Sequence, residues 1–261
     1  MKTIVIVPAR YSSTRFPGKP LARLGGREII LHVMDRVADA GYPGIVATDD
    51  GRIYRAVTEG GYQAVMTRAD HQSGTDRVRE ALDEIERISG EKYDIVINVQ
   101  GDEPFIDSAQ IKDLEKCFEE RAADIATLGR PYPSTGSYET LNDPNLVKLV
   151  KSPQGKALYF SRSVIPYLRG VKEHLRTRKH VYYTHIGIYG YRADILREIT
   201  ELPPSPLEKA ESLEQLRWLE NGYNIMVAES DKENIGIDTP EDLANAERIL
   251  RKSFGEEGKF L

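Results

Sequence analysis

The sequence predicts an α/β protein with a mostly parallel central sheet flanked by helices. Short β-branched runs alternate with amphipathic stretches through the first half of the chain, and the first run, Ile4-Val5-Ile6-Val7, is apolar at every position. A strand buried on both faces lacks polar alternation, and strands separated by helices pair in parallel through crossover connections. Ligands bind at the carboxyl ends of the strands in such sheets. The residues that directly follow each strand are therefore the first functional candidates.

The elements of this pattern follow one another along the chain. Strands are expected at residues 4–7, 44–48, 62–67 and 94–99, and helices at 28–40, from 51 onward and at 74–89. The pattern resumes with a strand at 183–191 and a helix that is capped at Ser205 and continues to Gly222.

An interruption separates the two parts of the pattern. Residues 130–182 contain a loop rich in Pro, Ser and Thr, two short expected strands at 146–151 and 157–161, and a basic stretch at 169–179. We interpret this segment as an inserted subdomain within a single domain that spans residues 1–261.

Composition narrows the class of protein. The chain has 261 residues and a net charge of −5, with 30% charged and 40% hydrophobic residues, values typical of a globular protein. An acidic chain lacks the broad basic surface of a nucleic-acid-binding protein, so no nucleic-acid partner is expected. The first apolar run is too short for a signal peptide or a membrane span. We expect a cytoplasmic protein without membrane insertion.

Three cations follow the first strand within ten residues, Arg10, Arg15 and Lys19. The loop that carries them contains Pro8, Pro17, Gly18 and Pro20. Arginine and lysine together suit a triphosphate, and backbone amides of such a loop add to an anion site. The alternative is a set of solvated surface charges, which the position at the end of a buried strand disfavours. The strand is not followed by G-x-G-x-x-G or G-x-x-x-x-G-K-[ST], which disfavours a dinucleotide-binding dehydrogenase and a P-loop NTPase.

Two carboxylates are candidates for a metal site. Asp102 follows the expected strand at 94–99, at the ligand edge of the sheet, where a carboxylate suits Mg²⁺. Asp238 precedes a helix start in which Thr239 is the N-cap, followed by Pro240 and, at the third position, Asp242. From the residues alone, support of that helix is the favoured role of Asp238.

Polar side chains at two further places suit a hydroxylated ligand. Ser73 and Asp76 form a capping box at the start of a helix, whose free amides also suit the edge of a base. His185, Gly187 and Tyr189 share one face of an expected strand. The residues are equally consistent with a ligand-binding face and with an ordinary half-exposed strand face.

Several longer motifs resemble those of the CMP-sugar synthetases, a nucleotidyltransferase family. They are Pro8-Ala9-Arg10 with Ser13, Arg15 and Pro17-Gly18-Lys19-Pro20-Leu21, then His71-Gln72-Ser73-Gly74-Thr75-Asp76-Arg77, Val99-Gln100-Gly101-Asp102-Glu103-Pro104, Tyr159-Phe160-Ser161-Arg162, and Asp238-Thr239-Pro240-Glu241-Asp242. Their order and length span nearly the whole chain. The downstream motifs are similar to those of the branch that acts on 3-deoxy-manno-octulosonate (Kdo). The resemblance implies a Rossmann-like nucleotidyltransferase fold.

The resemblance also implies a site. Expected nucleotide-binding residues are Pro8, Ala9, Arg10, Arg15, Lys19, Ser73, Gly74, Thr75, Arg77 and Gln100. Expected sugar-binding residues are Gln100, Arg162, His185, Tyr189, Glu214 and Gln215. Asp102 and Asp238 are expected to share Mg²⁺, and Arg10, Arg15, Lys19 and Asp102 to act in catalysis.

The implied reaction converts CTP and Kdo to CMP-Kdo and pyrophosphate, which activates Kdo for lipopolysaccharide biosynthesis. The implied assembly is a homodimer in which the inserted subdomain makes the contact. Three alternatives remain open: a nucleotidyltransferase for a sialic acid or a hexose phosphate, a non-catalytic nucleotide-binding protein, and a glycosyltransferase. The last has no need of a triphosphate loop.

Overall fold

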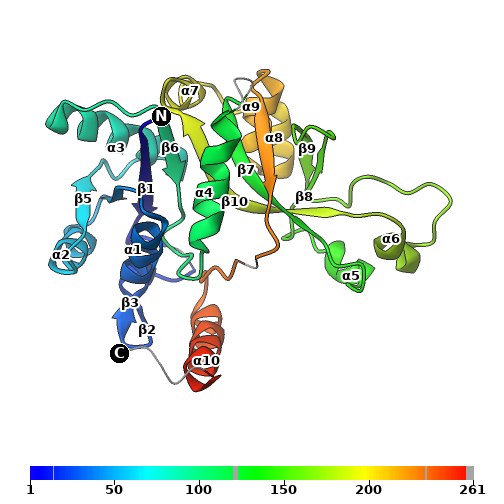
Figure 1. Ribbon diagram of the computed structural model, residues 1–261, viewed down its shortest axis with the longest axis horizontal. Helices are drawn as coiled ribbons and strands as arrows, with labels where there is room; N and C mark the ends of the chain where they lie inside the picture. Colours follow the sequence, from blue (N-terminus) through cyan, green and yellow to red (C-terminus); the bar gives the residue numbers. More distant parts are fainter. Residues whose placement is uncertain (14, 120–122, 233, 257–261) are drawn as a thin grey trace. The chain divides into compact units, whose positions relative to one another are not determined.

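A computed structural model describes residues 1–13, 15–119, 123–232 and 234–256. The described chain divides into two compact units. Figure 1 labels helices and strands of both. The first comprises Met1–Ile111 and the described residues after 233, and the second lies within Lys112–Lys232. The second unit contains the whole of the predicted insertion at 130–182 and extends beyond it on both sides.

A four-stranded parallel sheet forms the centre of the first unit. Its strands lie in the order β6 (Ile95–Asn98), β1 (Thr3–Ala9), β4 (Gly44–Thr48) and β5 (Gln63–Met66). The four apolar residues of β1 from Ile4 to Val7 have no exposed surface. Burial of both faces of β1 explains its continuous apolar run and confirms the predicted α/β class with a largely parallel sheet.

Helices and short elements complete the first unit. They are a 3₁₀ turn (Lys19–Leu21), a two-stranded ribbon of β2 (Arg23–Leu24) and β3 (Arg27–Glu28), α1 (Ile29–Ala40), α2 (Gly51–Glu59), α3 (Gly74–Ser89), the start of α4 (Ser108–Lys116), and α10 (Pro240–Glu256). The predicted bounds of α3 are confirmed at both ends. Its capping box at Ser73 and Asp76 fixes the start, and the left-handed Gly90 fixes the end.

The order of the strands places a topological switch at β1. The chain moves from β1 to β4 and β5 in one direction, then returns past β1 to β6. Right-handed crossover connections assign α1 and α2 to one face of the sheet and α3 to the other. Such a reversal opens a crevice at the carboxyl ends of the strands on either side of it. The loops after β1 and β6 therefore meet where a ligand is expected.

The second unit has a mixed sheet. Its strands lie in the order β11 (Ile225–Glu229), β7 (Ile125–Pro131), β10 (Tyr183–Arg192), β8 (Lys148–Lys151) and β9 (Ala157–Ser161). Among the described strands of this unit, β11 and β7 pair in parallel and the other neighbours pair antiparallel. The described helical elements of this unit are the rest of α4, a 3₁₀ turn (Cys117–Glu119), α5 (Tyr138–Leu141), α6 (Glu173–Lys179), α7 (Ala193–Ile199), α8 (Pro206–Glu211) and α9 (Gln215–Glu220).

The predicted helix from Ser205 to Gly222 is wrong in its continuity. The chain forms α8 and α9 as separate helices because Ser212 adopts a left-handed conformation, with φ of 51°. The predicted start is confirmed, since Ser205 and Glu208 form a capping box.

A bulge in β10 also departs from the predicted alternation. The register with β7 pairs His185 with Gly129 and Tyr189 with Thr127, so two extra residues lie in β10 between the pairs. Gly129 and Thr127 share a face of β7, and His185 and Tyr189 therefore share a face despite the bulge.

The described helices include none with the length and apolar composition of a membrane span.

Gly101 offers a test of the packing at the switch point. A Cβ atom there would lie 2.9 Å from the carbonyl oxygen of Pro8, so we expect Gly101→Ala to lower the free energy of unfolding by about 1–3 kcal/mol. The matched control is Gly51→Ala at the start of α2, where an added Cβ meets nothing within 4 Å. There the helix should gain a few tenths of a kcal/mol, or about 1 at most. Urea unfolding measures both, and equal stability of the two variants would contradict this packing.

Candidate active site

A cavity of about 250 Å³ lies in the first unit at the carboxyl ends of β1 and β6. It is lined by Pro8, Ala9, Arg10, Ser13, Arg15, Lys19, Pro20, His71, Gln72, Ser73, Gly74, Arg77, Gln100, Gly101, Asp102 and Asp238. The structure thus brings together both predicted metal ligands and nine of the ten predicted nucleotide-binding residues. Thr75 is buried in the first turn of α3 and does not line the cavity. Four arginine and lysine side chains against two aspartates favour an anionic ligand.

The loop after β1 is closed on itself and braced from α2. The amide of Gly18 donates to the carbonyl of Tyr11 at 2.9 Å, and a Cβ on Gly18 would lie 3.0 Å from the Tyr11 ring. The guanidinium carbon of Arg52 lies 3.4 Å from the centroid of that ring. Asp50 holds the guanidinium with hydrogen bonds of 3.0 and 2.7 Å. These contacts fix the loop that carries Arg10 and Arg15.

Lys19 joins the two predicted metal ligands. Its Nζ lies 2.5 Å from Oδ2 of Asp102 and 3.0 Å from Oδ1 of Asp238, and the Lys19 side chain is 12% exposed. Arg15 reaches Asp238 at 3.1 Å from its much more exposed position. The cationic loop and the carboxylates are therefore a single charged cluster, an arrangement that the spacing along the chain does not reveal.

Backbone and side-chain contacts hold the two carboxylates in place. The amide of Ile237 donates to the carbonyl of Asp102 at 2.9 Å, which ties the turn after β6 to the segment before α10. Thr239 and Asp242 form the predicted cap, in which each side chain accepts the backbone amide of the other. Asp238 is therefore not needed as the cap of α10, and its carboxylate pairs with Lys19 and Arg15 instead.

Glu103 is a partly buried acid next to this cluster. It accepts a 2.6 Å hydrogen bond from Asn234, whose side-chain oxygen accepts one from Gln110. Burial raises the pKa of Glu103 to about 7, and the hydrogen bond from Asn234 opposes that rise. Glu103 thus points toward Asn234, and its hydrogen bond links the turn after β6 to the segment before α10.

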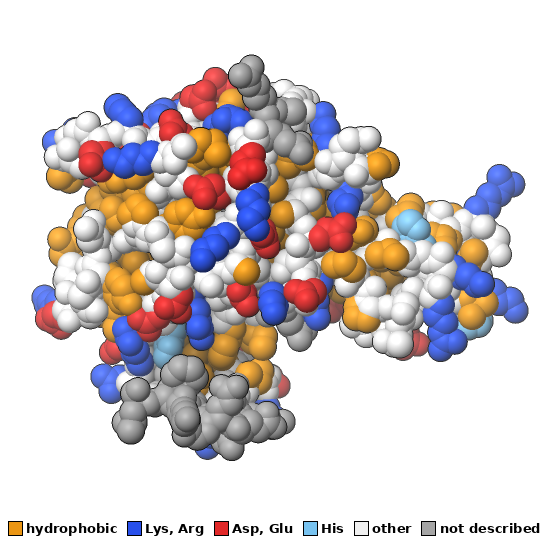
Figure 2. Space-filling view, in the orientation of Figure 1, with side chains coloured by type: hydrophobic (Ala, Val, Ile, Leu, Met, Phe, Trp, Pro, Cys, Tyr) orange, Lys and Arg blue, Asp and Glu red, His pale blue; other side chains and the backbone are white. Residues whose placement is uncertain are grey.

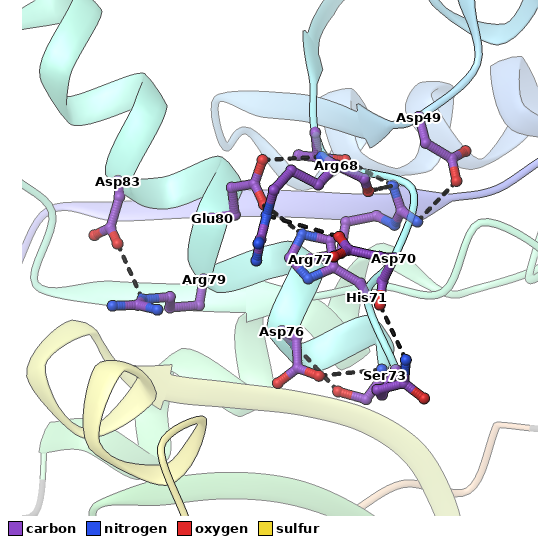
Figure 3. Close-up of polar contacts among 12 residues, drawn as sticks. Asp49, Arg68, Asp70, His71, Ser73, Asp76, Arg77, Arg79, Glu80 and Asp83 are labelled. Carbon is purple, nitrogen blue, oxygen red and sulfur yellow. Dashed lines mark hydrogen bonds and ion pairs between the residues drawn. The ribbon is translucent and has the colours of Figure 1, made fainter.

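The start of α3 forms another wall of the cavity (Figure 3). Arg77 is 4% exposed and donates to Oγ1 of Thr67 at 2.6 Å, while its other terminal nitrogen lies 3.1 Å from Asp49. These contacts anchor the first turn of α3 to the segments after β4 and β5. Arg77 consequently positions this wall in addition to lining the cavity, and its charge is already paired.

His71 is a wall residue that sequence reasoning left out of the site. Its Nε2 lies 2.5 Å from Glu80, whose carboxylate is also held by the backbone and side chain of Arg68 (Figure 3). Ser13, Gln72, Pro20 and Gly101 were omitted as well. All five residues lie within the sequence motifs that resemble the CMP-sugar synthetases, and that position could have predicted them.

Four of the predicted sugar-binding residues belong to neighbouring segments of the second unit. The rings of His185 and Tyr189 lie 5.5 Å apart, and Trp218 of α9 packs edge-on against Tyr189 at 5.1 Å. Gln215 is buried in α9, and Glu214 immediately precedes that helix. The shared face of β10 and the start of α9 therefore form one aromatic and polar group. Gln100, which is predicted to bind both the nucleotide and the sugar, belongs to the first unit.

The hydrogen bonds of His185 define its tautomer. Oγ1 of Thr127 lies 2.8 Å from the carbonyl oxygen of Ile188 and 3.0 Å from Nε2 of His185. The carbonyl can only accept, so the hydroxyl donates to it and accepts from Nε2–H. Burial lowers the pKa of His185 to about 3 and raises that of Tyr189. Both side chains are therefore uncharged at neutral pH, and Nδ1 of His185 is a hydrogen-bond acceptor.

Arg162 is held by backbone carbonyls of the second unit. Its guanidinium donates to Glu211 at 2.6 Å, to Pro144 at 2.9 Å and to Ser212 at 3.3 Å. The Glu211 carboxylate in turn accepts from Ser161 and from the amide of Arg162. Three of the five N–H groups of Arg162 are thereby used to shape the turn before Glu214. A ligand carboxylate would have to use the others.

The structure is that of an α/β protein with a cavity lined by arginine and lysine side chains at the switch point of its sheet. The sequence profile of the cytidylyltransferase family matches residues 4–235. The chain belongs to the cytidylyltransferase family.

Individual relatives resemble the chain over almost its full length. It is 52% identical over 256 residues to a 3-deoxy-manno-octulosonate cytidylyltransferase of Phocaeicola vulgatus, covering 98% of this chain and all of the relative. It is likewise 52% identical over 250 residues to the protein of that name from Porphyromonas gingivalis, covering 96% and 97%. A solved structure of CMP:2-keto-3-deoxy-manno-octonic acid synthetase complexed with CTP superposes with a TM-score of 0.87 at 40% identity, covering 97% of this chain and all of that one.

The pKa of His185 gives a pH dependence of stability. Its depressed value means that the unfolded chain, with a pKa of 6.5, binds the proton more readily. This contribution to stability is complete above pH 6.5 and is lost as the pH falls from 6.5 toward 3, by up to about 1.4 kcal/mol per pH unit. We expect His185→Phe to lose less stability than the wild type between pH 6.5 and 5.5, as measured by urea unfolding. Parallel losses in the two proteins would show that His185 is not buried in its neutral form.

Proposed function

We propose that this protein transfers CMP from CTP to Kdo and releases pyrophosphate. The observation that carries the proposal is the cluster of Arg15, Lys19, Asp102 and Asp238 in one cavity at the switch point of the sheet. A triphosphate needs cations, and nucleotidyl transfer needs charge stabilisation at the α-phosphate. The names of the relatives, which match over the whole chain, support the same nucleotide and acceptor.

The residues that line the cavity suit the parts of CTP. Arg10, Arg15 and Lys19 would hold the β- and γ-phosphates and stabilise the pyrophosphate as it leaves. Ser73, Gly74 and Arg77, at the start of α3, would line the base and ribose end, together with Gln100 after β6. Thr75 would act from within the same turn of α3.

The carboxylates fit Mg²⁺. Asp102 and Asp238 offer oxygen ligands, and within the described part of the chain no group of three or more His, Cys, Asp or Glu residues is placed to hold a metal. Mg²⁺ commonly uses one or two protein carboxylates and takes its remaining ligands from phosphates and water. When bound, it would supply charge neutralisation at the α-phosphate and a lower pKa for the attacking hydroxyl.

The acceptor set suits a sugar acid. Nδ1 of His185 can accept a hydrogen bond, and Tyr189, Glu214 and Gln215 of the same unit would add further polar groups for hydroxyls. Arg162 would bind the carboxylate with the N–H groups that its backbone contacts leave. In the transfer, the anomeric hydroxyl of Kdo would lose its proton to water and its oxygen would form a bond to the α-phosphorus. The bond from that phosphorus to the oxygen shared with the β-phosphate would break, and pyrophosphate would leave. Positioning of the two substrates supplies much of the rate without a protein nucleophile.

The assembly and location are part of the proposal. The segment around α6 is basic and exposes Tyr167 and Val181, which are 73% and 55% accessible, and Figure 2 shows Lys and Arg side chains on this part of the molecule. A protruding apolar and basic surface of this kind suits contact with a second copy of the chain. We propose a cytoplasmic homodimer that provides CMP-Kdo for lipopolysaccharide biosynthesis.

Pyrophosphate release tests the proposed reaction. Wild-type protein with CTP, Mg²⁺ and Kdo should release pyrophosphate, and UTP or a sialic acid should substitute poorly. Asp102→Asn and Asp238→Asn should each lower the rate at least about 10²-fold, by analogy with the loss of one charge-stabilising group. Asp39→Asn is the control, since Asp39 lies in an exposed ion pair with Arg36.

Three outcomes of this assay would count against the proposal. Release that does not depend on Kdo would argue against the acceptor, and no release at all would argue against the enzyme class. Near-normal rates in both site variants at saturating Mg²⁺ would remove the metal assignment. Circular dichroism of each variant separates loss of chemistry from loss of fold.

The brace on the triphosphate loop predicts a change in nucleotide affinity. Tyr11→Leu removes the ring that Arg52 contacts and that leaves no room for a side chain at Gly18. A partly exposed cation–π contact contributes about 1 kcal/mol, so the Kd for CTP should rise about fivefold. Tyr11→Phe keeps the ring and should bind CTP as the wild type does. Calorimetric titration measures both, and equal affinity of the leucine and phenylalanine variants would mean that the ring does not brace the loop.

A further inference from the structure

Lys19 lies on the same oxygen atoms that a divalent cation would use. Its ammonium contacts Oδ2 of Asp102 and Oδ1 of Asp238 at 2.5 and 3.0 Å, and the side chain is largely buried. An ammonium between two carboxylates compensates their mutual repulsion. The cluster is therefore electrostatically satisfied by the protein's own side chains.

A divalent cation shared by these carboxylates competes with Lys19. Mg²⁺ binds carboxylate oxygens at about 2.0–2.1 Å, so on these two atoms it would lie close to the ammonium, and the two cations would repel each other. Binding of the metal at this place therefore favours movement of the ammonium away from the carboxylates. With only two protein carboxylates, and those already paired, the protein alone offers such a cation a weak site.

The backbone of Lys19 is fixed by hydrogen bonds, while its side chain faces the cavity and can move within it. The amide of Lys19 donates to Phe16 at 3.2 Å, and its carbonyl accepts from Ala22 at 3.0 Å. Displacement is thus confined to the four-carbon stem and its ammonium. Arg10 and Ser13 line the same cavity, so an anion bound on the loop lies within the region that Lys19 already faces.

We infer that Lys19 is the resident counter-ion of Asp102 and Asp238, and that a bound nucleoside triphosphate draws its ammonium away and opens these carboxylates to a divalent cation. This inference rests on the proposed function, because the triphosphate is the anion that competes for Lys19. The triphosphate also supplies oxygen ligands that the two carboxylates lack. Metal and nucleotide then bind with positive coupling, and by linkage each raises the affinity of the other by the same factor.

Removal of the Lys19 charge should open the metal site without nucleotide. Mn²⁺ is the probe, and free Mn²⁺ is followed by electron paramagnetic resonance during titration of the full-length, nucleotide-free protein. We expect Lys19→Met to bind Mn²⁺ about tenfold more tightly than the wild type, within the usual range of coupling between sites. Lys19→Arg keeps the charge and should bind as weakly as the wild type.

Controls separate a local effect from a change in net charge. Lys2→Met removes one charge from an exposed pair with Glu91 and should leave Mn²⁺ affinity unchanged. The double variant with Lys19→Met and Asp102→Asn should lose the gain, which locates the ion. Lys19→Gln is a second neutral variant in case the methionine variant does not fold.

Mn²⁺ affinity that does not rise in either neutral variant would overturn the counter-ion role. A rise that persists in the double variant would do the same, since the ion would then lie elsewhere. The pyrophosphate assay keeps this result apart from the proposed reaction. If the wild type turns over CTP and Kdo while the neutral variants bind Mn²⁺ no more tightly, only the counter-ion role fails. If the wild type releases no pyrophosphate, the proposed function fails, and the coupling to nucleotide fails with it.

Discussion

The ion cluster of Lys19 with Asp102 and Asp238 is the interaction on which the site depends. It joins three segments that are far apart in sequence: the loop after β1, the turn after β6 and the residues before α10. The 2.9 Å bond from Ile237 to Asp102 holds the last two segments together through the backbone. The Lys19 ammonium is the least exposed member of the cluster, and without the carboxylates it would be a largely buried charge with no partner. The charged residues that would perform the transfer thus also hold these three segments together at the edge of the sheet.

The sheet explains why these segments meet. Reversal of the strand order at β1 opens a crevice there, and the parallel arrangement directs the loops after β1 and β6 to the same edge. Gly101 allows the turn after β6 to approach the backbone of Pro8, where a side chain would collide. The brace of Tyr11 and Arg52 then fixes the loop from the α2 side. Fold and charge therefore converge on one cavity, in keeping with a cytidylyltransferase.

Local signals predicted the first unit well and the second less well. The apolar run of β1 and the capped start of α3 depend on neighbouring residues alone, and both are confirmed. The break at Ser212 and the bulge in β10 depend on contacts between strands and helices that no local pattern encodes. The cavity includes the predicted nucleotide residues except Thr75. The sequence does not predict that Arg77 pairs with Asp49 or that Lys19 pairs with both aspartates, because the partners lie 28 or more residues apart.

The central claim is that Asp102 and Asp238 hold the metal that accompanies the nucleotide. Anomalous diffraction from crystals of the protein with CTP and Mn²⁺ tests it most directly. The account predicts an anomalous peak within coordination distance of both carboxylates and of a phosphate oxygen, with the Lys19 ammonium moved from the carboxylates to the triphosphate. A peak coordinated by phosphate oxygens alone, with Lys19 still bridging Asp102 and Asp238, would contradict it.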